Sequence, residues 1–173
     1  GGRLEDMRSF QKYIGGSPTN IAAGAARLGL ESAVITRVGD EHMGRFIKEQ
    51  LAREGVSTQG VKVDPDRLTA LVLLGIRDSE QFPLIFYREN CADMGLTVDD
   101  IDPEFIKTAR AIVATGTHLS NVQVEAATLT ALKLALQNFS HCDLCRGARN
   151  LVFGGGAAGA RVMILEDAPG RVE

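Results

Sequence analysis

The stretch that decides the fold runs over residues 15–29 and reads GGSPTNIAAGAARLG. Two glycines remove side chains just before a helix that we expect over 18–28. Ser17 and Thr19 are candidate N-caps for this helix, and Pro18 suits its first position. Asn20 carries both a donor and an acceptor, which suits recognition of hydroxyl groups. Two interpretations stand: a loop–helix junction without a ligand, or a floor on which a small polar molecule lies.

The bulk composition is typical of a soluble globular protein. The 173 residues fit one domain or part of a larger one, and 45% are hydrophobic and 24% charged. A net charge of -3 argues against a nucleic-acid partner, which would favour a basic surface. We find no apolar run long enough to span a membrane, no signal peptide, and only three cysteines. We therefore expect a cytoplasmic protein without membrane or nucleic-acid partners.

The residues that follow this helix alternate between strand-like and helix-like patterns. Gly29 ends the helix, and the mostly apolar, β-branched run over 32–38 predicts a strand buried on both faces. A second helix is expected over 41–53, where apolar residues recur at helical spacing before Gly55. Helix, strand and helix with short connections indicate a layered α/β sheet.

Three short strands are expected next, over 60–63, 69–77 and 82–88, with a polar turn at 78–81. They favour a small antiparallel set inserted between α/β units, which is often a lid or a dimer surface. The alternative is an edge extension of the main sheet. This insert divides the α/β pattern into two parts.

The α/β pattern resumes after the insert. Asp102-Pro103-Glu104 predicts a short helix, and 111–115 predicts a buried strand. A helix is expected over 123–137, with an apolar side that consists of Val124, Leu129, Leu132 and Leu136. Residues 138–173 have no clear period, apart from one possible strand over 161–165.

Ligands of open α/β sheets bind beyond the carboxyl ends of the strands. Asp40 follows one predicted strand, where it is either a hydroxyl acceptor or the N-cap of the next helix. His118 follows another, as a ligand of a substrate oxygen or as a structural residue. Arg88 closes the insert, where it either holds a carboxylate or phosphate or lies solvated on an edge strand.

Metal and dinucleotide sites have weak support. Cys142 and Cys145 form one Cys-x-x-Cys without a second pair, which is half of a zinc site, so no metal ligands are assigned. Gly154-Gly155-Gly156 lacks the Gly-Lys-Ser/Thr of a P-loop, and no Gly-x-Gly-x-x-Gly follows a strand. An NAD-binding Rossmann domain is therefore a minor alternative.

Several gapped positions together resemble the first signature of the ribokinase-like (phosphofructokinase-B) carbohydrate kinases. The stretch GGSPTNIA over 15–22 is followed in register by Gly29 and Gly39, and VGDEHMG over 38–44 continues the pattern. Residues 3–7, 35–46 and 82–93 also resemble the family members that phosphorylate 5-dehydro-2-deoxygluconate in inositol breakdown. The resemblance covers about residues 1–137.

This resemblance implies a partial ribokinase-like three-layer α/β fold with a small β-sheet lid. It implies ATP-dependent phosphorylation of a sugar acid, with ATP and Mg2+ as cofactors and a homodimer through the lid strands. Arg88 matches a lid arginine used near the substrate carboxylate. The implied substrate-binding residues are Gly15, Gly16, Asn20, Asp40, Tyr87, Arg88 and Asn90.

The sequence also departs from the family pattern. The family's first strand, with a sugar-binding Asp, would precede Gly1, and its later Gly-Ala-Gly-Asp motif does not occur in these residues. That motif carries the catalytic base and an anion hole, so no catalytic residue is assigned and the chain alone is expected to be inactive. Alternatives are a 2-keto-3-deoxygluconate kinase, a fructokinase, or a non-catalytic dimerisation or binding module.

Overall fold

The computed structural model describes residues 3–76 and 82–138. The elements in chain order are η1 (Leu4–Asp6), α1 (Ser17–Arg27), β1 (Thr36–Gly39), α2 (His42–Arg53), β2 (Val61–Asp64), β3 (Leu71–Leu74), β4 (Leu84–Tyr87), η2 (Ala92–Gly95), η3 (Val98–Asp100), α3 (Pro103–Lys107), η4 (Gly116–Ser120) and α4 (Val122–Gln137), where η marks a 3-10 helix. The expected turn at 78–81, the strand at 161–165, the glycines at 154–156 and the Cys142/Cys145 pair lie outside the described residues.

A parallel pair of strands forms the centre of the fold. Strand β1 pairs with β2 from Thr36↔Val61 to Gly39↔Asp64, and α2 makes the connection between them. The sequence assigned 60–63 to the inserted lid, and this prediction is wrong. Helix α2 returns the chain to the start of β1, so the next strand runs beside β1 in the same direction and buries Val61.

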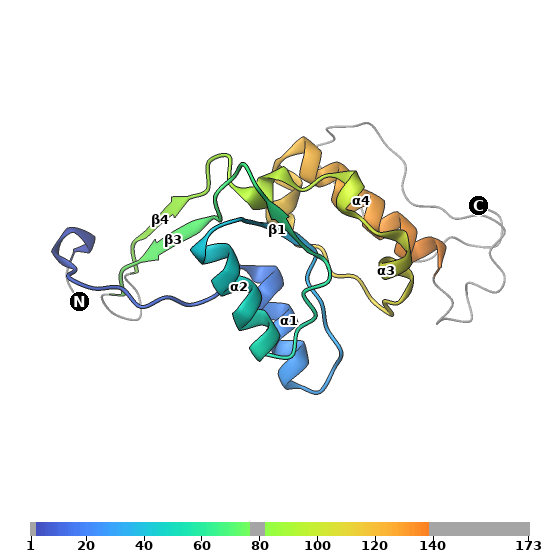
Figure 1. The fold of residues 1–173 in the computed structure, drawn as a ribbon, viewed down its shortest axis with the longest axis horizontal. Helices are drawn as coiled ribbons and strands as arrows, with labels where there is room; N and C mark the ends of the chain where they lie inside the picture. Colours follow the sequence, from blue (N-terminus) through green and yellow to red (C-terminus); the bar gives the residue numbers. More distant parts are fainter. Residues whose placement is uncertain (1–2, 77–81, 139–173) are drawn as a thin grey trace.

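Two hydrophobic clusters lie against opposite faces of β1 and of the two residues that precede it. Val34 and Val38 belong to one cluster, whereas the intervening Ile35 packs against the other, as alternation along a strand requires. The first cluster includes Ala22 of α1 and Leu51 of α2, and the second is built from α3, α4 and the 3-10 turns. In Figure 1, α1 and α2 lie side by side, with α3 and α4 beyond β1. This is the layered α/β arrangement that the sequence predicts.

Helix α1 begins one residue earlier than predicted and without a side-chain cap. Its N-cap is Gly16 at φ 91°, and neither Ser17 nor Thr19 caps it, contrary to expectation. Thr19 Oγ1 instead donates to the carbonyls of Gly15 and Gly16, because it already lies within the first turn. Gly29, at φ 87°, follows the helix end as the sequence indicates.

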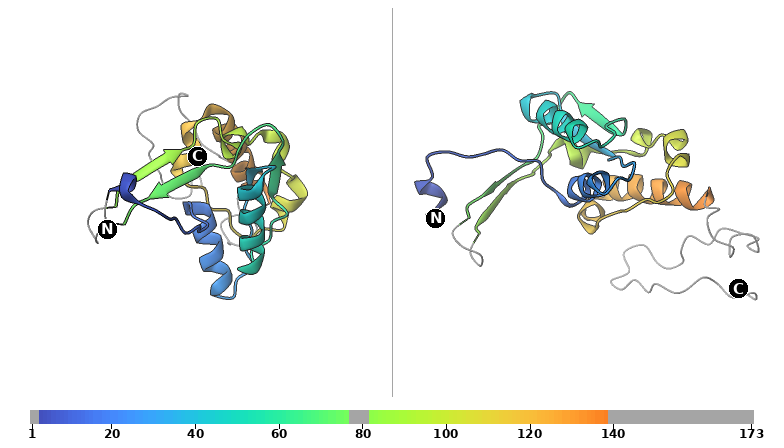
Figure 2. Two further views of the ribbon diagram at one scale, coloured as in Figure 1. Left: turned by 60° about the vertical axis from the view of Figure 1, so that its left-hand side comes forward. Right: turned by 90° about the horizontal axis from the view of Figure 1, so that it is seen from below.

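The lid consists of β3 and β4, which pair antiparallel from Leu71↔Tyr87 to Leu74↔Leu84. Figures 1 and 2 show this pair projecting from the body formed by β1 and the helices. Buried Gly75 follows β3, and a Cβ atom there would lie 3.0 Å from Leu4 Cδ2 and 3.2 Å from Met7 Cε. The N-terminal segment therefore packs beside the lid.

Two further sequence predictions are wrong. Residues 111–115 have no regular secondary structure, because they form no ladder with a described strand. On the predicted apolar side of α4, Val124 is buried as expected, but Leu129 and Leu136 are exposed. The other buried residues of α4 are Ala127 and Ala131. The small alanines allow close approach of the neighbouring elements, so the larger side chains lie outside the contact.

Candidate functional site

The carboxyl end of β1 leads directly into the start of α2. Glu41, rather than the expected Asp40, is the N-cap, and its carboxylate accepts from Met43 N at 2.5 Å and Gly44 N at 3.0 Å. The capping alternative for Asp40 is therefore wrong. The side chain of Asp40 is 68% exposed and does not cap the helix, and its Oδ1 lies 3.8 Å from Arg45 Nη1.

Glu41 also holds Thr69, which leads into β3, the first strand of the lid. Its Oε1 accepts from the Thr69 hydroxyl and, at 3.3 Å, from Thr69 N, while Gly39 N donates to Thr69 Oγ1 at 3.0 Å. Burial alone would raise the pKa of Glu41, but the hydrogen bonds from Thr69 and from the α2 backbone outweigh it and lower that pKa. Glu41 therefore joins β1, α2 and the lid as an anion.

The glycines at this junction are required by close backbone contacts. A Cβ atom on Gly39 would lie 2.6 Å from the carbonyl oxygen of Arg67, and one on Gly44 would lie 2.0 Å from that of Gly39. No side chain fits at either position without movement of the backbone. The lid segment at 67–69 therefore packs directly on the end of β1.

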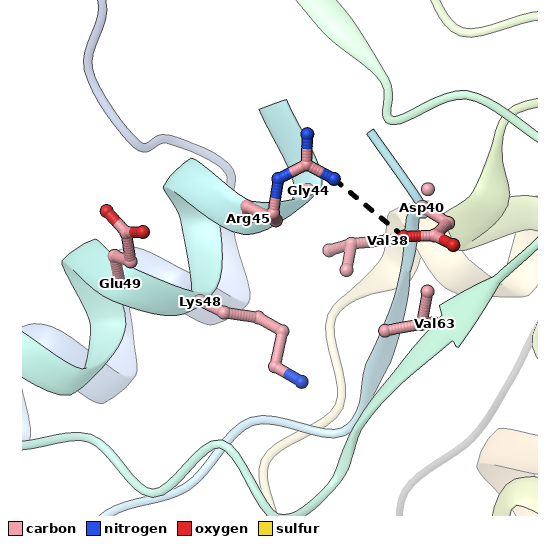
Figure 3. A pocket seen from close by; sticks show the side chains of 8 residues that line it. Val38, Asp40, Gly44, Arg45, Lys48, Glu49 and Val63 are labelled. Carbon is pink, nitrogen blue, oxygen red and sulfur yellow. Dashed lines mark ion pairs between the residues drawn. The ribbon is translucent and has the colours of Figure 1, made fainter. Parts of the chain in front are cut away.

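A shallow groove of about 240 Å3 lies between α2 and the two parallel strands. Figure 3 shows Arg45 and Lys48 extending from α2, with Arg45 turned toward Asp40 and with Val38 and Val63 on the strands. Asp40 is thus an accessible carboxylate at the edge of a groove that also carries two cations. Its position suits hydrogen bonding to a hydroxyl of a bound molecule.

Asp64, at the carboxyl end of β2, is the centre of a buried charge network. Its side chain is 1% exposed and accepts from Arg37 Nη1 at 3.2 Å and Arg67 Nη1 at 3.1 Å. Arg37 also pairs with Asp100 at 2.8 Å. Burial would raise the pKa of Asp64, but hydrogen bonds from the backbone N–H of Asp66 and from both arginines lower it.

The second connection to the lid carries the remaining predicted residues. Arg88 Nε and Nη2 lie 2.7 and 2.6 Å from Asp93 Oδ2, so the solvated-arginine alternative is wrong. Asn90 has φ 49°, and its Oδ1 accepts from Arg67 Nε at 3.2 Å. Tyr87 is the last residue of β4 and is exposed.

The start of α1 lies at the same end of the fold as the start of α2. Arg27 and Glu54 form a two-bond ion pair at 2.6 Å that joins the C-terminal ends of these helices. Helices α1 and α2 run side by side in Figures 1 and 2. Their N-termini therefore face the same way. Gly15, Gly16 and Asn20 are exposed there.

The structure gathers some predicted residues and leaves others apart. Arg88 and Asn90 lie in the second connection to the lid, which is joined to the first where Leu68 O accepts from Ala92 N at 2.8 Å. Asp40 follows Gly39, whose backbone packs against the first connection at residues 67–69. No hydrogen bond or ion pair among the described residues links Asn20 to Asp40 or Arg88. The side chain of His118 lies outside the described part of the structure.

Three residues of the candidate site were not predicted from the sequence, namely Glu41, Asp64 and Asp93. The preference of helix N-caps for Asp over Glu favoured Asp40 over its neighbour. Asp64 would have been found had 61–64 been assigned to the parallel sheet, because it ends a strand there. Nothing in the local pattern connects Asp93 with Arg88.

The described residues form no group of three or more His, Cys, Asp or Glu that could hold a metal ion. None of the described helices is long and apolar enough to cross a membrane.

Known proteins resemble this chain in sequence and in fold. The profile described as pfkB family carbohydrate kinase matches residues 2–158. A 5-dehydro-2-deoxygluconokinase of Bacillus cereus is 38% identical over 133 residues, and one of Listeria monocytogenes is 37% identical over 136. These matches cover 76% and 78% of this chain but 40% and 42% of the relatives, so the chain spans about two fifths of their length.

A solved structure of an uncharacterized sugar kinase from Pyrococcus horikoshii superimposes with a TM-score of 0.73 at 27% identity. The match covers 80% of this chain and 45% of that one, and a second structure of the same kinase is a complex with ATP. The fold is thus a partial ribokinase-like α/β fold. The match of the family profile over most of the sequence, together with these kinase relatives, shows that this chain belongs to the pfkB family of carbohydrate kinases.

Proposed function

We propose that this chain forms the sugar-acid-binding part of an ATP-dependent kinase that phosphorylates 5-dehydro-2-deoxygluconate. The choice of this substrate is supported by the two relatives that are named 5-dehydro-2-deoxygluconokinase. The observation that carries the proposal is Arg88, a cation that Asp93 holds in the connection that follows β4. A kinase that uses ATP would act where ATP is abundant, so we propose a cytoplasmic location.

Each proposed contact uses a group that suits a polyhydroxylated acid. Gly15 and Gly16 let the ligand approach the backbone, and Asn20 can donate to and accept from hydroxyls. Asp40 accepts from a hydroxyl. Arg88 binds the carboxylate with charge-assisted hydrogen bonds, which are roughly twice as strong as neutral ones.

Tyr87 and Asn90 lie on either side of Arg88 along the chain. Tyr87 offers an exposed ring and hydroxyl from the end of β4. The left-handed backbone at Asn90 turns the chain directly after Arg88, and its bond with Arg67 ties this turn to the first lid connection. We propose that both residues border the ligand.

ATP and Mg2+ are proposed as cofactors of the whole protein. Support comes from the family and from the ATP complex of a structural neighbour. The described residues contain neither a metal-ligating cluster nor the Gly-Ala-Gly-Asp motif. We therefore propose that these residues only bind and orient the sugar acid, and we expect the 173-residue polypeptide alone to bind it without phosphorylating it.

Isothermal titration of the 173-residue chain with 5-dehydro-2-deoxygluconate tests this proposal. Asp40→Asn is expected to raise Kd by about tenfold to a hundredfold, since one hydrogen bond to a charged group is worth about 1.5–3 kcal/mol. Asp99→Asn is the matched control, because Asp99 is an exposed aspartate outside the site and should leave Kd unchanged. Equal Kd values for both variants would contradict the assignment of Asp40.

The same titration separates the related kinases. If 2-keto-3-deoxygluconate or fructose binds more tightly than 5-dehydro-2-deoxygluconate, that sugar becomes the proposed substrate, within the same family. In either case the proposed sugar site would stand, with a different ligand.

We also propose that two copies of the chain form a homodimer through the lid. Cross-strand partners share a face, so Leu71 and Tyr87 are on one face, and Val72 and Phe86 are on the other. All four are more than 40% exposed. If Tyr87 faces the ligand, the face of Val72 and Phe86 is left for a second copy of the chain, which would bury it.

Light scattering during size-exclusion chromatography tests this interface. Phe86→Glu is expected to convert a dimer into a single chain, because a charge in an apolar interface is costly. Ile85→Glu, on the opposite face of the same strand, is the matched control and should leave the dimer intact. A dimer that persists in Phe86→Glu, or a single chain before any substitution, would contradict this interface. A dimer without sugar-acid binding would favour the non-catalytic alternative.

A further inference from the structure

Arg88 is held by one carboxylate oxygen. Its Nε and Nη2 both lie against Asp93 Oδ2, at 2.7 and 2.6 Å, and the two side chains are 28% and 16% exposed. A guanidinium has five N–H donors, and this contact uses one edge of it. The remaining donors, including those of Nη1, are not used by Asp93.

The turn that carries this pair is itself well fixed. Cys91 Sγ donates to Tyr87 O at 3.4 Å, and Ala92 N donates to Leu68 O at 2.8 Å. Cys91 and Ala92 are buried. The backbone next to Asp93 is therefore fixed, so Asp93 can hold the guanidinium group of Arg88 in one place.

The second oxygen of Asp93 adds an unfavourable contribution to the folding stability of this pair. Oδ1 is buried and has no hydrogen-bond partner among the residues that the structure describes. A buried acceptor without a partner costs free energy, about 1–3 kcal/mol for a typical group. The chain therefore tolerates an unfavourable group at the position that orients Arg88.

We infer that Asp93 is a positioning residue that presents Arg88 to the substrate carboxylate and thereby makes the site selective for sugar acids over neutral sugars. This inference rests on the proposed function, because it assumes that Arg88 binds that carboxylate. Asp93 occupies one edge of the guanidinium and leaves the other donors for the ligand. Holding the side chain before the ligand arrives removes part of the entropy cost of binding.

The test measures Kd for 5-dehydro-2-deoxygluconate and for D-fructose with the 173-residue chain and its variants. Asp93→Ala is expected to weaken binding of the acid about tenfold and to leave binding of fructose unchanged. Asp93→Asn keeps an acceptor oxygen at the same distance from the backbone and should restore most of the lost affinity. Thermal unfolding of each variant confirms that the fold is retained.

A double substitution isolates the action through Arg88. Arg88→Ala should remove the preference for the acid, and Asp93→Ala added to Arg88→Ala should have no further effect. A loss that persists in the Arg88→Ala background, equal losses for acid and fructose, or unchanged or tighter binding of the acid by Asp93→Ala would each overturn the inference. If the unsubstituted chain binds neither ligand, the proposed function fails and this inference fails with it.

Discussion

At the scale of single residues, two helical glycines have opposite roles. Gly44 lies in the first turn of α2, where a Cβ would meet Gly39 O at 2.0 Å. A Cβ on Gly24 in α1 would meet no atom of the described residues within 4 Å outside the backbone of its own helix and its chain neighbours. Gly44→Ala should therefore destabilise the chain by about 1–3 kcal/mol or more, and Gly24→Ala should stabilise it by about 0.5–1 kcal/mol. Urea unfolding of the two variants measures both effects. Destabilisation of similar size in both would show that the contact at Gly44 is not as tight as described.

The candidate residues could be predicted only where the chemistry is local. The exposed start of α1 follows from the glycines and Pro18, and Arg88 is marked by its place after an apolar strand. The partners of these residues come from elsewhere in the chain. Thr69 reaches Glu41 across 28 positions, and Arg37 reaches Asp100 across 63. Such pairs exist only once the strands are in register, so no local pattern indicates them.

At the scale of elements, Glu41 connects the lid with the end of β1. Glu41→Gln replaces one of its two acceptor oxygens with a donor amide, so bonds to Thr69 or to the α2 backbone are lost. We expect a loss of about 1 kcal/mol in unfolding free energy. Amide hydrogen exchange should become faster in β3 and β4 and stay unchanged in α4.

Glu49→Gln is the control for this substitution. Glu49 lies on the same helix with a side chain 65% exposed, and its pair with Arg53 is 4.0 Å long. Surface pairs of this kind contribute about 0–1 kcal/mol, so little change is expected. Lid exchange that is as fast in Glu49→Gln as in Glu41→Gln would argue against Glu41 as the anchor.

Most element types were predictable, except for the strand expected over 111–115, and their partners were less so. The helices over 17–27 and 42–53 end shortly before Gly29 and Gly55, and the helix over 122–137 begins directly after its N-cap Asn121. Strand β2 was misassigned because four residues give no sign of whether their partner is parallel or antiparallel. The buried stripe of α4 consists of alanines, and a pattern based on large apolar residues pointed to the wrong side.

At the scale of the whole molecule, three carboxylates make stability depend on pH. The pKa values of Glu41, Asp64 and Asp100 are all lowered in the folded chain, because hydrogen bonds outweigh the opposing effect of burial. The unfolded chain therefore binds more protons in the acidic range, and stability falls as pH drops below about 5.

Urea unfolding between pH 7 and pH 3 measures this dependence. The unfolding free energy should be nearly constant above about pH 5 and decrease below it. Asp100→Asn should flatten the decrease, because one of the contributing groups no longer titrates. A stability that rises toward low pH would show that these carboxylates are not held as anions in the folded chain.

We propose that the start of α1, the end of β1 and Arg88 beside the lid form one sugar-acid site. Amide chemical shifts of the 173-residue chain, followed by NMR during titration with 5-dehydro-2-deoxygluconate, test it most directly. We expect Gly15, Gly16, Asn20, Asp40 and Arg88 to shift together with a single Kd, while the amides of α3 and α4 stay in place. Shifts confined to α3 and α4, or none at saturating ligand, would contradict the claim.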